Sequence, residues 1–108
     1  MGAKPIEPTE ESKKYAEHLV LGVRSKLSEI DGLIQSNSHN WKVQRMALVD
    51  KNILRIAIFE MIHSADPVPA KACINEAVEL AKKFGSEDSS SFINGILDQV
   101  AKLNNQGA

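Results

Sequence analysis

Residues 49–62 constrain the fold of this 108-residue chain more than any other stretch. They read VDKNILRIAIFEMI, so apolar side chains occupy nearly every side of a helical wheel. The polar residues of this stretch are Asp50, Lys51, Asn52, Arg55 and Glu60. A helix that is apolar almost all the way round must be covered by other helices. We therefore predict a central helix here, with a bundle built around it.

Upstream of this stretch, the sequence predicts one long helix followed by a loop. Thr9 is the expected helix start, because its hydroxyl can accept from free backbone amides and two acidic residues follow it. Apolar residues then recur every three or four positions, at Tyr15, Leu19, Val23, Leu27 and Ile30. We expect Asp31-Gly32 to interrupt this pattern, with a further turn or a short helix after it. The six polar residues 35–40 favour a loop.

Downstream, prolines and a glycine divide the chain into two more helices. Pro67 and Pro69 end the central helix, because proline lacks the amide proton, and Pro69 can open the next one. Gly85 is the expected stop of that helix, and Ser86 or Asp88 is the expected cap of the last. The residues expected to face the core are Cys73, Ile74, Ala77, Val78, Leu80, Ala81 and Phe84, then Phe92, Ile93, Ile96, Leu97, Val100 and Leu103.

The sequence contains no alternating strand pattern, so we predict an all-α fold, an orthogonal bundle of four to five helices. The expected organisation is a flexible leader over residues 1–8, a single domain over 9–103 and a frayed tail over 104–108. The formal net charge of −1 argues against holding a polyanion by bulk charge. One cysteine, and no apolar run long enough for a signal peptide or membrane span, favour a cytoplasmic protein without membrane contact.

Neither a catalytic site nor a metal site is visible in the sequence. Asp50 and Glu60 lie ten residues apart on one predicted helix, about 15 Å, which is too far for concerted acid–base work. The histidines are His18, His39 and His63. None has a second ligand at the spacing that metal sites use. Cys73 belongs to an apolar stripe, where a thiol behaves as a small hydrophobic side chain. We predict no enzyme activity, no catalytic residue, no metal and no cofactor.

Two features of the last predicted helix exceed what a plain bundle needs. Residues 86–92, SEDSSSF, combine free amides at a helix start, hydroxyls and an aromatic ring, although capping and a core phenylalanine are the ordinary explanation. Gly95 costs about 1 kcal/mol relative to alanine, so we expect a close approach there. A neighbouring helix is the usual cause, and an exposed Asn94 that hydrogen-bonds a base or a partner is the alternative. A weaker feature is the positive charge of Lys42, Arg45, Lys51 and Arg55, which a solvated face would also explain.

Four longer strings are more specific than these features. They run from Trp41 to Ala47, from Val49 to Glu60, from Ile74 to Gly85 and from Phe92 to Asp98. In this order they closely resemble the NusB family of transcription antitermination factors, and the match is continuous from about Asn40 to Ala101. Residues 19–31 are similar to the family's middle helix more loosely.

The resemblance implies an all-helical protein that binds and does not catalyse. Its expected partners are the boxA element of nascent ribosomal RNA, the small-subunit ribosomal protein NusE and the transcription elongation complex. Asp88 and Phe92 match positions that contact RNA, the aromatic ring by stacking on an unpaired base. Asp50 matches a position at the NusE interface. The residues expected to bind RNA are Asp88, Ser89, Phe92 and Asn94, and those expected to bind the protein partner are Asp50 and Lys51.

Two departures from the family pattern lead to further expectations. Family members begin with an arginine-rich segment and two helices that this chain lacks, so we expect a trimmed or divergent member with weaker RNA binding. Ser91 stands where members often carry a basic residue, which removes a phosphate contact. The face of residues 49–62 left uncovered then predicts self-association as a homodimer. Two alternatives stay open: a protein-interaction module with little RNA binding, and the NusB-like accessory domain of a ribosomal RNA cytosine methyltransferase.

Overall fold

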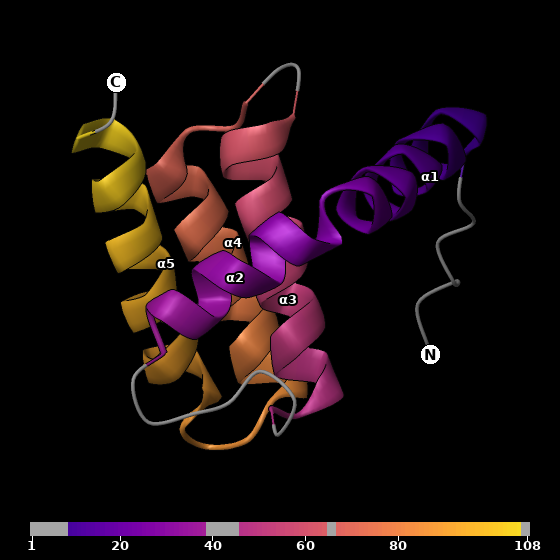
Figure 1. The fold of residues 1–108 in the computed structure, drawn as a ribbon. Coiled ribbons are helices and arrows are strands. Elements are labelled where there is room, and N and C mark those ends of the chain that lie inside the picture. The colour runs from indigo at the N-terminus through magenta and orange to yellow at the C-terminus, as the bar shows by residue number, and fades with distance from the viewer. Residues whose placement is uncertain (1–8, 39–45, 65–66, 107–108) are drawn as a thin grey trace, which may run out of the picture.

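The computed structural model describes residues 9–38, 46–64 and 67–106. Their elements are α1 (Glu10–Ser25), α2 (Leu27–Ser36), α3 (Leu48–Ile58), the π-helical turn η2 (Phe59–His63), α4 (Ala70–Phe84) and α5 (Ser89–Gln106). Helices α3, α4 and α5 stand side by side, α2 crosses them, and α1 extends away from the body (Figure 1). The predicted all-α fold is confirmed, and the described residues contain no strand.

The predicted central helix is the rod formed by α3 and η2. It contacts α1, α2, α4 and α5, which explains why apolar residues occupy most of its circumference. Leu54 and Ile58 are fully buried, and Phe59 is nearly so. From the flanking helices the core receives chiefly Ile30, Ile34, Ala77, Ala81, Ile93, Ile96, Leu97 and Val100. Among the described residues that are buried in this core, Phe59 is the one aromatic side chain.

The break between the first two helices differs from the prediction. It falls at Lys26, whereas Asp31 and Gly32 lie inside α2. Tertiary contacts explain the difference, because Ile30 and Ile34, one turn apart, are both fully buried. Asp31 also accepts two hydrogen bonds of 2.9 Å from the guanidinium of Arg55 on α3. These contacts outweigh the cost of the exposed Gly32 within a helix.

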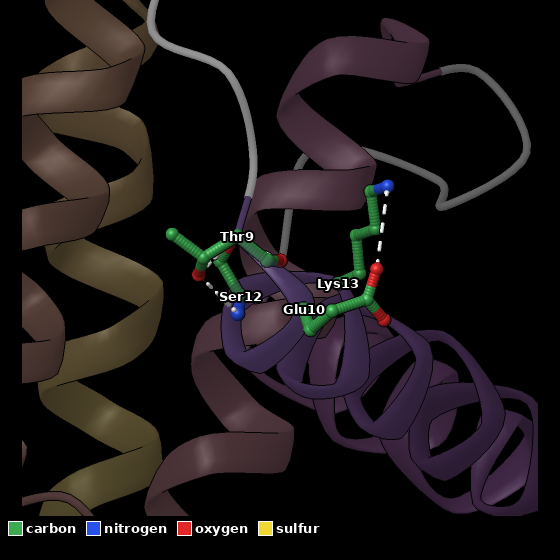
Figure 2. Close-up of polar contacts among 4 residues, drawn as sticks. All are labelled: Thr9, Glu10, Ser12 and Lys13. Atoms are coloured by element: carbon green, nitrogen blue, oxygen red, sulfur yellow. Dashed lines mark hydrogen bonds and ion pairs between the residues drawn. The ribbon is translucent and has the colours of Figure 1, made fainter.

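Helix α1 begins as predicted but packs differently. The Thr9 hydroxyl accepts from the backbone N–H of Ser12 at 3.0 Å, and an ion pair joins Lys13 to Glu10 (Figure 2). None of the 16 residues of α1 is buried, so the expected apolar stripe contributes only partial packing. Leu19 and Val23 pack against the core at half-burial, whereas Tyr15 is 45% exposed.

Contacts of Tyr15 and Gly22 hold α1 against η2. The Tyr15 hydroxyl donates to Glu60 Oε2 at 2.5 Å. Gly22 lies directly against the ring of Phe59, and a Cβ at this position would overlap the ring. The close approach of α1 to Phe59 therefore requires a glycine at position 22. The prediction that another group approaches Gly95 closely is wrong, because a Cβ there would meet nothing within 4 Å among the described residues.

Part of the expected core of α4 and α5 lies at the surface instead. Leu80 and Phe84 are 37% and 66% exposed, and Leu103 is 52% exposed. Leu80 and Phe84 line a groove of about 310 Å³ along α3 and α4, which also contains Val49 and Ile56. We call it the α3–α4 groove. These side chains stay exposed because no described element covers that side of α3.

The helix ends near the C-terminus follow the prediction more closely. Gly85 ends α4, and its N–H donates to the carbonyl of Ala81 at 2.9 Å. Helix α5 continues to Gln106, three residues beyond the expected domain end at Leu103. Within the described part of the chain, no helix is long and apolar enough to cross a membrane.

Candidate functional site

A pocket of about 280 Å³ opens between the first turns of α3 and α5. It is lined by Met46, Ala47, Asp50, Ser86, Asp88, Ser89 and Phe92, and we call it the α3–α5 pocket. Three residues expected to bind RNA, Asp88, Ser89 and Phe92, therefore share one pocket with Asp50, which was expected to bind the protein partner. The chain separates Asp50 from Ser89 by 39 positions, so only the fold brings the two groups together.

A chain of hydrogen bonds fixes the floor of this pocket. The Ser89 hydroxyl donates to Asp50 Oδ2 at 3.1 Å and accepts from the Ser86 N–H at 2.9 Å. Ser89 is 2% exposed and Asp50 is 9% exposed, so both groups are buried. A buried carboxylate held this way has a fixed orientation, since moving it would leave polar groups unpaired.

Gly85 allows this arrangement by keeping the loop before α5 close. A Cβ at Gly85 would lie 2.6 Å from both Cβ and Oγ of Ser89 and 2.8 Å from the carbonyl oxygen of Ala81. Its backbone is extended, so the requirement for glycine is the missing side chain rather than an unusual backbone angle. The residue that ends α4 thus also positions Ser89 against Asp50.

The rim of the pocket is accessible and acidic. Asp88 is exposed and Phe92 is half-buried, so one carboxylate and part of an aromatic ring face the opening. With Asp50 the pocket holds two carboxylates, and the described residues that line it include no Lys, Arg or His. Such a site favours a planar or cationic group over a phosphate.

The other two expected site residues lie elsewhere. Asn94 is exposed on a separate groove between α4 and α5, beside Lys71, Asn75 and Asp98. Lys51 follows Asp50 on α3 and is half-buried, but it does not line the α3–α5 pocket. The structure therefore does not bring Asn94 and Lys51 together with the pocket residues.

Arg55, one of the four residues of the expected positive patch, is neutralised by an ion pair. Arg55 forms the ion pair with Asp31, and this partner raises the pKa of Arg55 above its ordinary value. Its guanidinium holds α2 on α3 and is not part of a free basic face. Lys42 and Arg45 lie outside the described residues.

Three lining residues, Met46, Ala47 and Ser86, were not among the residues expected to bind RNA or the protein partner. Met46 and Ala47 come just before α3. In the sequence they stood out only as members of the string from Trp41 to Ala47 that resembles the family. Ser86 belongs to residues 86–92, which the sequence singled out as a possible recognition surface, although capping was the ordinary explanation of Ser86 itself.

Cys73 has the structural role that its position predicted. It is buried, and its thiol lies 3.7 Å from the carbonyl oxygen of Val68. Burial raises the pKa of this thiol, which keeps it protonated and unreactive. Among residues 9–38, 46–64 and 67–106, no group of three or more His, Cys, Asp or Glu side chains could hold a metal ion.

Known proteins resemble this chain both in sequence and in fold. The family model described as the NusB family matches residues 3–102. The transcription antitermination protein NusB of Bdellovibrio bacteriovorus is 57% identical over 88 residues, which cover 82% of this chain and 65% of the relative. The NusB of Myxococcus xanthus is 54% identical over 82% of this chain and 62% of its own length.

A solved structure, T. maritima NusB, superposes with a TM-score of 0.81 at 39% identity. This match covers 87% of the chain and 66% of the solved one. The chain thus spans slightly less than two thirds of the length of the first two relatives. A match over nearly all its residues, with the same fold, shows that this chain belongs to the NusB family.

Proposed function

We propose that this chain is a binding factor in transcription antitermination. It binds boxA-type single-stranded ribosomal RNA together with NusE, in the cytoplasm and within the transcription elongation complex, and it catalyses no reaction. Membership of the NusB family and relatives named transcription antitermination protein support this proposal.

The observation that carries the proposal is the convergence of Asp50, Asp88 and Phe92 on one pocket. A half-buried aromatic ring at a pocket rim is rigidly held yet accessible, which suits stacking on an unpaired base. Asp88 beside it can accept hydrogen bonds from base amino groups. Ser89 contributes indirectly, because its hydroxyl already bonds Asp50 and Ser86.

Asn94 and Lys51 belong to the proposal as outlying contacts. An RNA strand stacked on Phe92 reaches Asn94 only by passing around α5, since the two residues border different pockets. Lys51 lies next to Asp50 along α3 and extends the expected contact with the protein partner beyond the pocket.

The test is the affinity for a short boxA-type RNA and for a scrambled RNA, with and without NusE, over a range of salt concentrations. Phe92→Ala is the informative variant, because base stacking contributes about 1–3 kcal/mol. We expect it to weaken boxA binding by roughly 5- to 150-fold. Phe84→Ala is the matched control, since Phe84 is an exposed phenylalanine outside the pocket.

Two outcomes would contradict the proposal. Equal binding of boxA-type and scrambled RNA in both conditions would exclude sequence-specific recognition. Equal losses in Phe92→Ala and Phe84→Ala would exclude Phe92 as the stacking residue.

A second candidate function is a protein-interaction or self-associating module with little RNA binding. The α3–α4 groove favours it, because Val49, Ile56, Leu80 and Phe84 expose apolar surface side by side. In this case Phe84→Ser would reduce self-association in sedimentation experiments, while Phe92→Ala would leave every measured interaction unchanged.

A further inference from the structure

Two apolar grooves adjoin along α3. The first is the α3–α4 groove. The second, of about 350 Å³, lies between α1 and the same helix, and we call it the α1–α3 groove. It is lined by Leu19, Val20, Val23, Arg24, Leu27, Asn52, Arg55 and Ile56. Because Asn52 and Ile56 line both grooves, the two form one continuous surface with Ile56 on the border between them.

This surface exposes six large apolar side chains. Val20 of the α1–α3 groove is 58% exposed, Phe84 of the α3–α4 groove is 66% exposed, and Ile56 on their border is 38% exposed. The other three are Leu27, Val49 and Leu80. A contiguous apolar surface with charged residues at its edges is typical of a protein interface, because covering it removes apolar area from water.

The charged residues on the two sides of this surface have opposite signs. Arg55 and Glu60 already have partners within the chain. The other two are Arg24, exposed on the α1–α3 groove, and Glu76, exposed on the α3–α4 groove. Neither forms an ion pair or a hydrogen bond with a residue in the described part of the chain. One side of the surface therefore carries an available cation and the other an available anion.

We propose that this surface pairs with itself, so that two copies of the chain form a symmetric dimer. A two-fold axis close to Ile56 lays the α1–α3 groove of one copy on the partner's α3–α4 groove, and the reverse. Arg24 then faces the partner subunit's Glu76, and this contact occurs twice in the dimer. The inference goes beyond the binding of RNA and NusE. It deepens the second candidate function, on which it rests, by naming the partner and the mode of pairing.

Charge complementarity favours a second copy over other occupants. A two-fold contact brings the same patch of both copies together, so the two halves of that patch must complement each other. Here both halves are apolar, and their available charges are opposite. A nucleic acid strand is not favoured, because the two cations Arg24 and Arg55 are matched by the two acids Glu60 and Glu76.

The dimer also gives α1 the packing that it lacks in a single chain. Helix α1 has no buried residue and extends away from the body (Figure 1). In the dimer its exposed Val20 lies against the apolar α3–α4 groove of the partner. Burial of this kind stabilises a helix more than its own propensity does.

The first experiment measures the mass of the chain by sedimentation equilibrium over a range of concentrations. We expect an equilibrium between monomer and dimer. Phe84→Ser removes an exposed apolar side chain from both copies, so the dissociation constant should rise about tenfold or more. Leu103→Ser is the matched control, because Leu103 is 52% exposed on α5 and lines neither groove. Circular dichroism of each variant confirms that its helices are intact.

Charge reversal tests the pairing of Arg24 with Glu76. Arg24→Glu and Glu76→Arg each place like charges opposite each other at both contacts, so each variant alone should dimerise about tenfold more weakly or worse. An equimolar mixture of the two variants restores opposite charges at both contacts and should dimerise like the native chain. Lys102→Glu, a charge reversal on α5 outside both grooves, should have no effect.

Three results would overturn the inference. The first is a native chain that stays monomeric at every concentration, and the second is growth beyond the dimer, which head-to-tail contacts would produce. The third is a mixture that dimerises no better than its two components. Self-association without rescue by mixing removes this mode of pairing but leaves the second candidate function standing. Binding of boxA-type RNA and NusE, measured on the same samples, tests the antitermination function separately.

Discussion

Asp50 and Glu60 sit near opposite ends of the rod formed by α3 and η2, and each accepts a hydrogen bond from a hydroxyl far along the chain. Asp50 is buried and bonds Ser89 of α5, whereas Glu60 is half-buried and bonds Tyr15 of α1. Close packing against a glycine accompanies both: Ser89 lies against Gly85, and Phe59, next to Glu60, lies against Gly22.

The two contacts differ in what they leave available. The bond from Tyr15 fastens α1, a helix with no buried residue, to the body of the molecule. The bond from Ser89 instead orients a carboxylate whose other oxygen has no partner among the described residues and that lines a pocket. A hydroxyl–carboxylate hydrogen bond thus attaches a helix at one end and orients a carboxylate that lines a pocket at the other.

The largest expected effect comes from filling the space at Gly22. Gly22→Ala places a methyl group in the ring of Phe59, which is 4% exposed and cannot move into solvent. We expect a loss of about 1–3 kcal/mol in the free energy of unfolding, measured in urea. Gly95→Ala is the control, because it meets open space within a helix and should stabilise by about 0.5–1 kcal/mol. A neutral Gly22→Ala would mean that α1 does not pack on η2 in this way.

Removing the hydroxyl at the Asp50 end should have a slightly smaller effect. Ser89→Ala removes two hydrogen bonds. Asp50 Oδ2 loses its donor, and the Ser86 N–H loses its acceptor. We expect the free energy of unfolding to fall by about 1–2 kcal/mol, because buried polar groups lose their partners. Ser91→Ala, at an exposed position on the same helix, should change it by less than about 0.5 kcal/mol. Equal effects of the two substitutions would contradict the role given to Ser89.

The corresponding change at the other end should cost less. Tyr15→Phe removes only the hydroxyl that donates to Glu60, and Tyr15 is 45% exposed, so water can replace the bond. The expected loss is below about 1 kcal/mol in the same unfolding experiment. A loss larger than that of Ser89→Ala would reverse the comparison between the two ends.

The last prediction concerns the ionisation of the Tyr15 hydroxyl. It takes place only in strong base, so its effect at neutral pH is the smallest of those described. The hydrogen bond to Glu60, with burial and the negative charge of Glu60, raises the pKa of Tyr15 from 10.0 to about 12. Tyr15 is the single tyrosine of the chain, so absorbance near 295 nm, where tyrosinate absorbs, follows its titration alone. A folded-state pKa above the ordinary value stabilises the fold below pH 10, and this contribution is lost as the pH rises through 12.

The control for this titration is Glu60→Gln. It removes the negative charge, so the midpoint should move back toward 10. A native midpoint near 10 would show that Tyr15 does not donate to Glu60 in solution.

Local sequence signals predicted helix ends well where the responsible groups are neighbours. Thr9 caps α1, and Gly85 ends α4. The same reasoning failed at Asp31-Gly32, because the pairing of Asp31 with Arg55 and the burial of Ile34 keep α2 helical there. It also placed Leu80 and Phe84 in the core, since periodicity gives the apolar side of a helix but not whether a neighbour covers it.

The candidate site divides in a similar way. Family-like strings identified Asp50, Asp88 and Phe92 as residues of interest, but not that they line one pocket, nor that Met46 and Ser86 complete it. Asn94 is close to Phe92 in sequence and borders a different groove, because two positions along a helix rotate the side chain by about 200°.

The sequence alone determined the all-helical class, most helix ends and the family, because these depend on spacing, capping and strings of neighbouring residues. Only the tertiary structure decided which distant groups meet: Asp50 with Ser89, 39 positions apart, and Tyr15 with Glu60, 45 positions apart. Hydrogen bonding acts over about 3 Å in space whatever the separation along the chain. Contacts of this kind, and the acceptor left open at Asp50, become defined only when the helices pack.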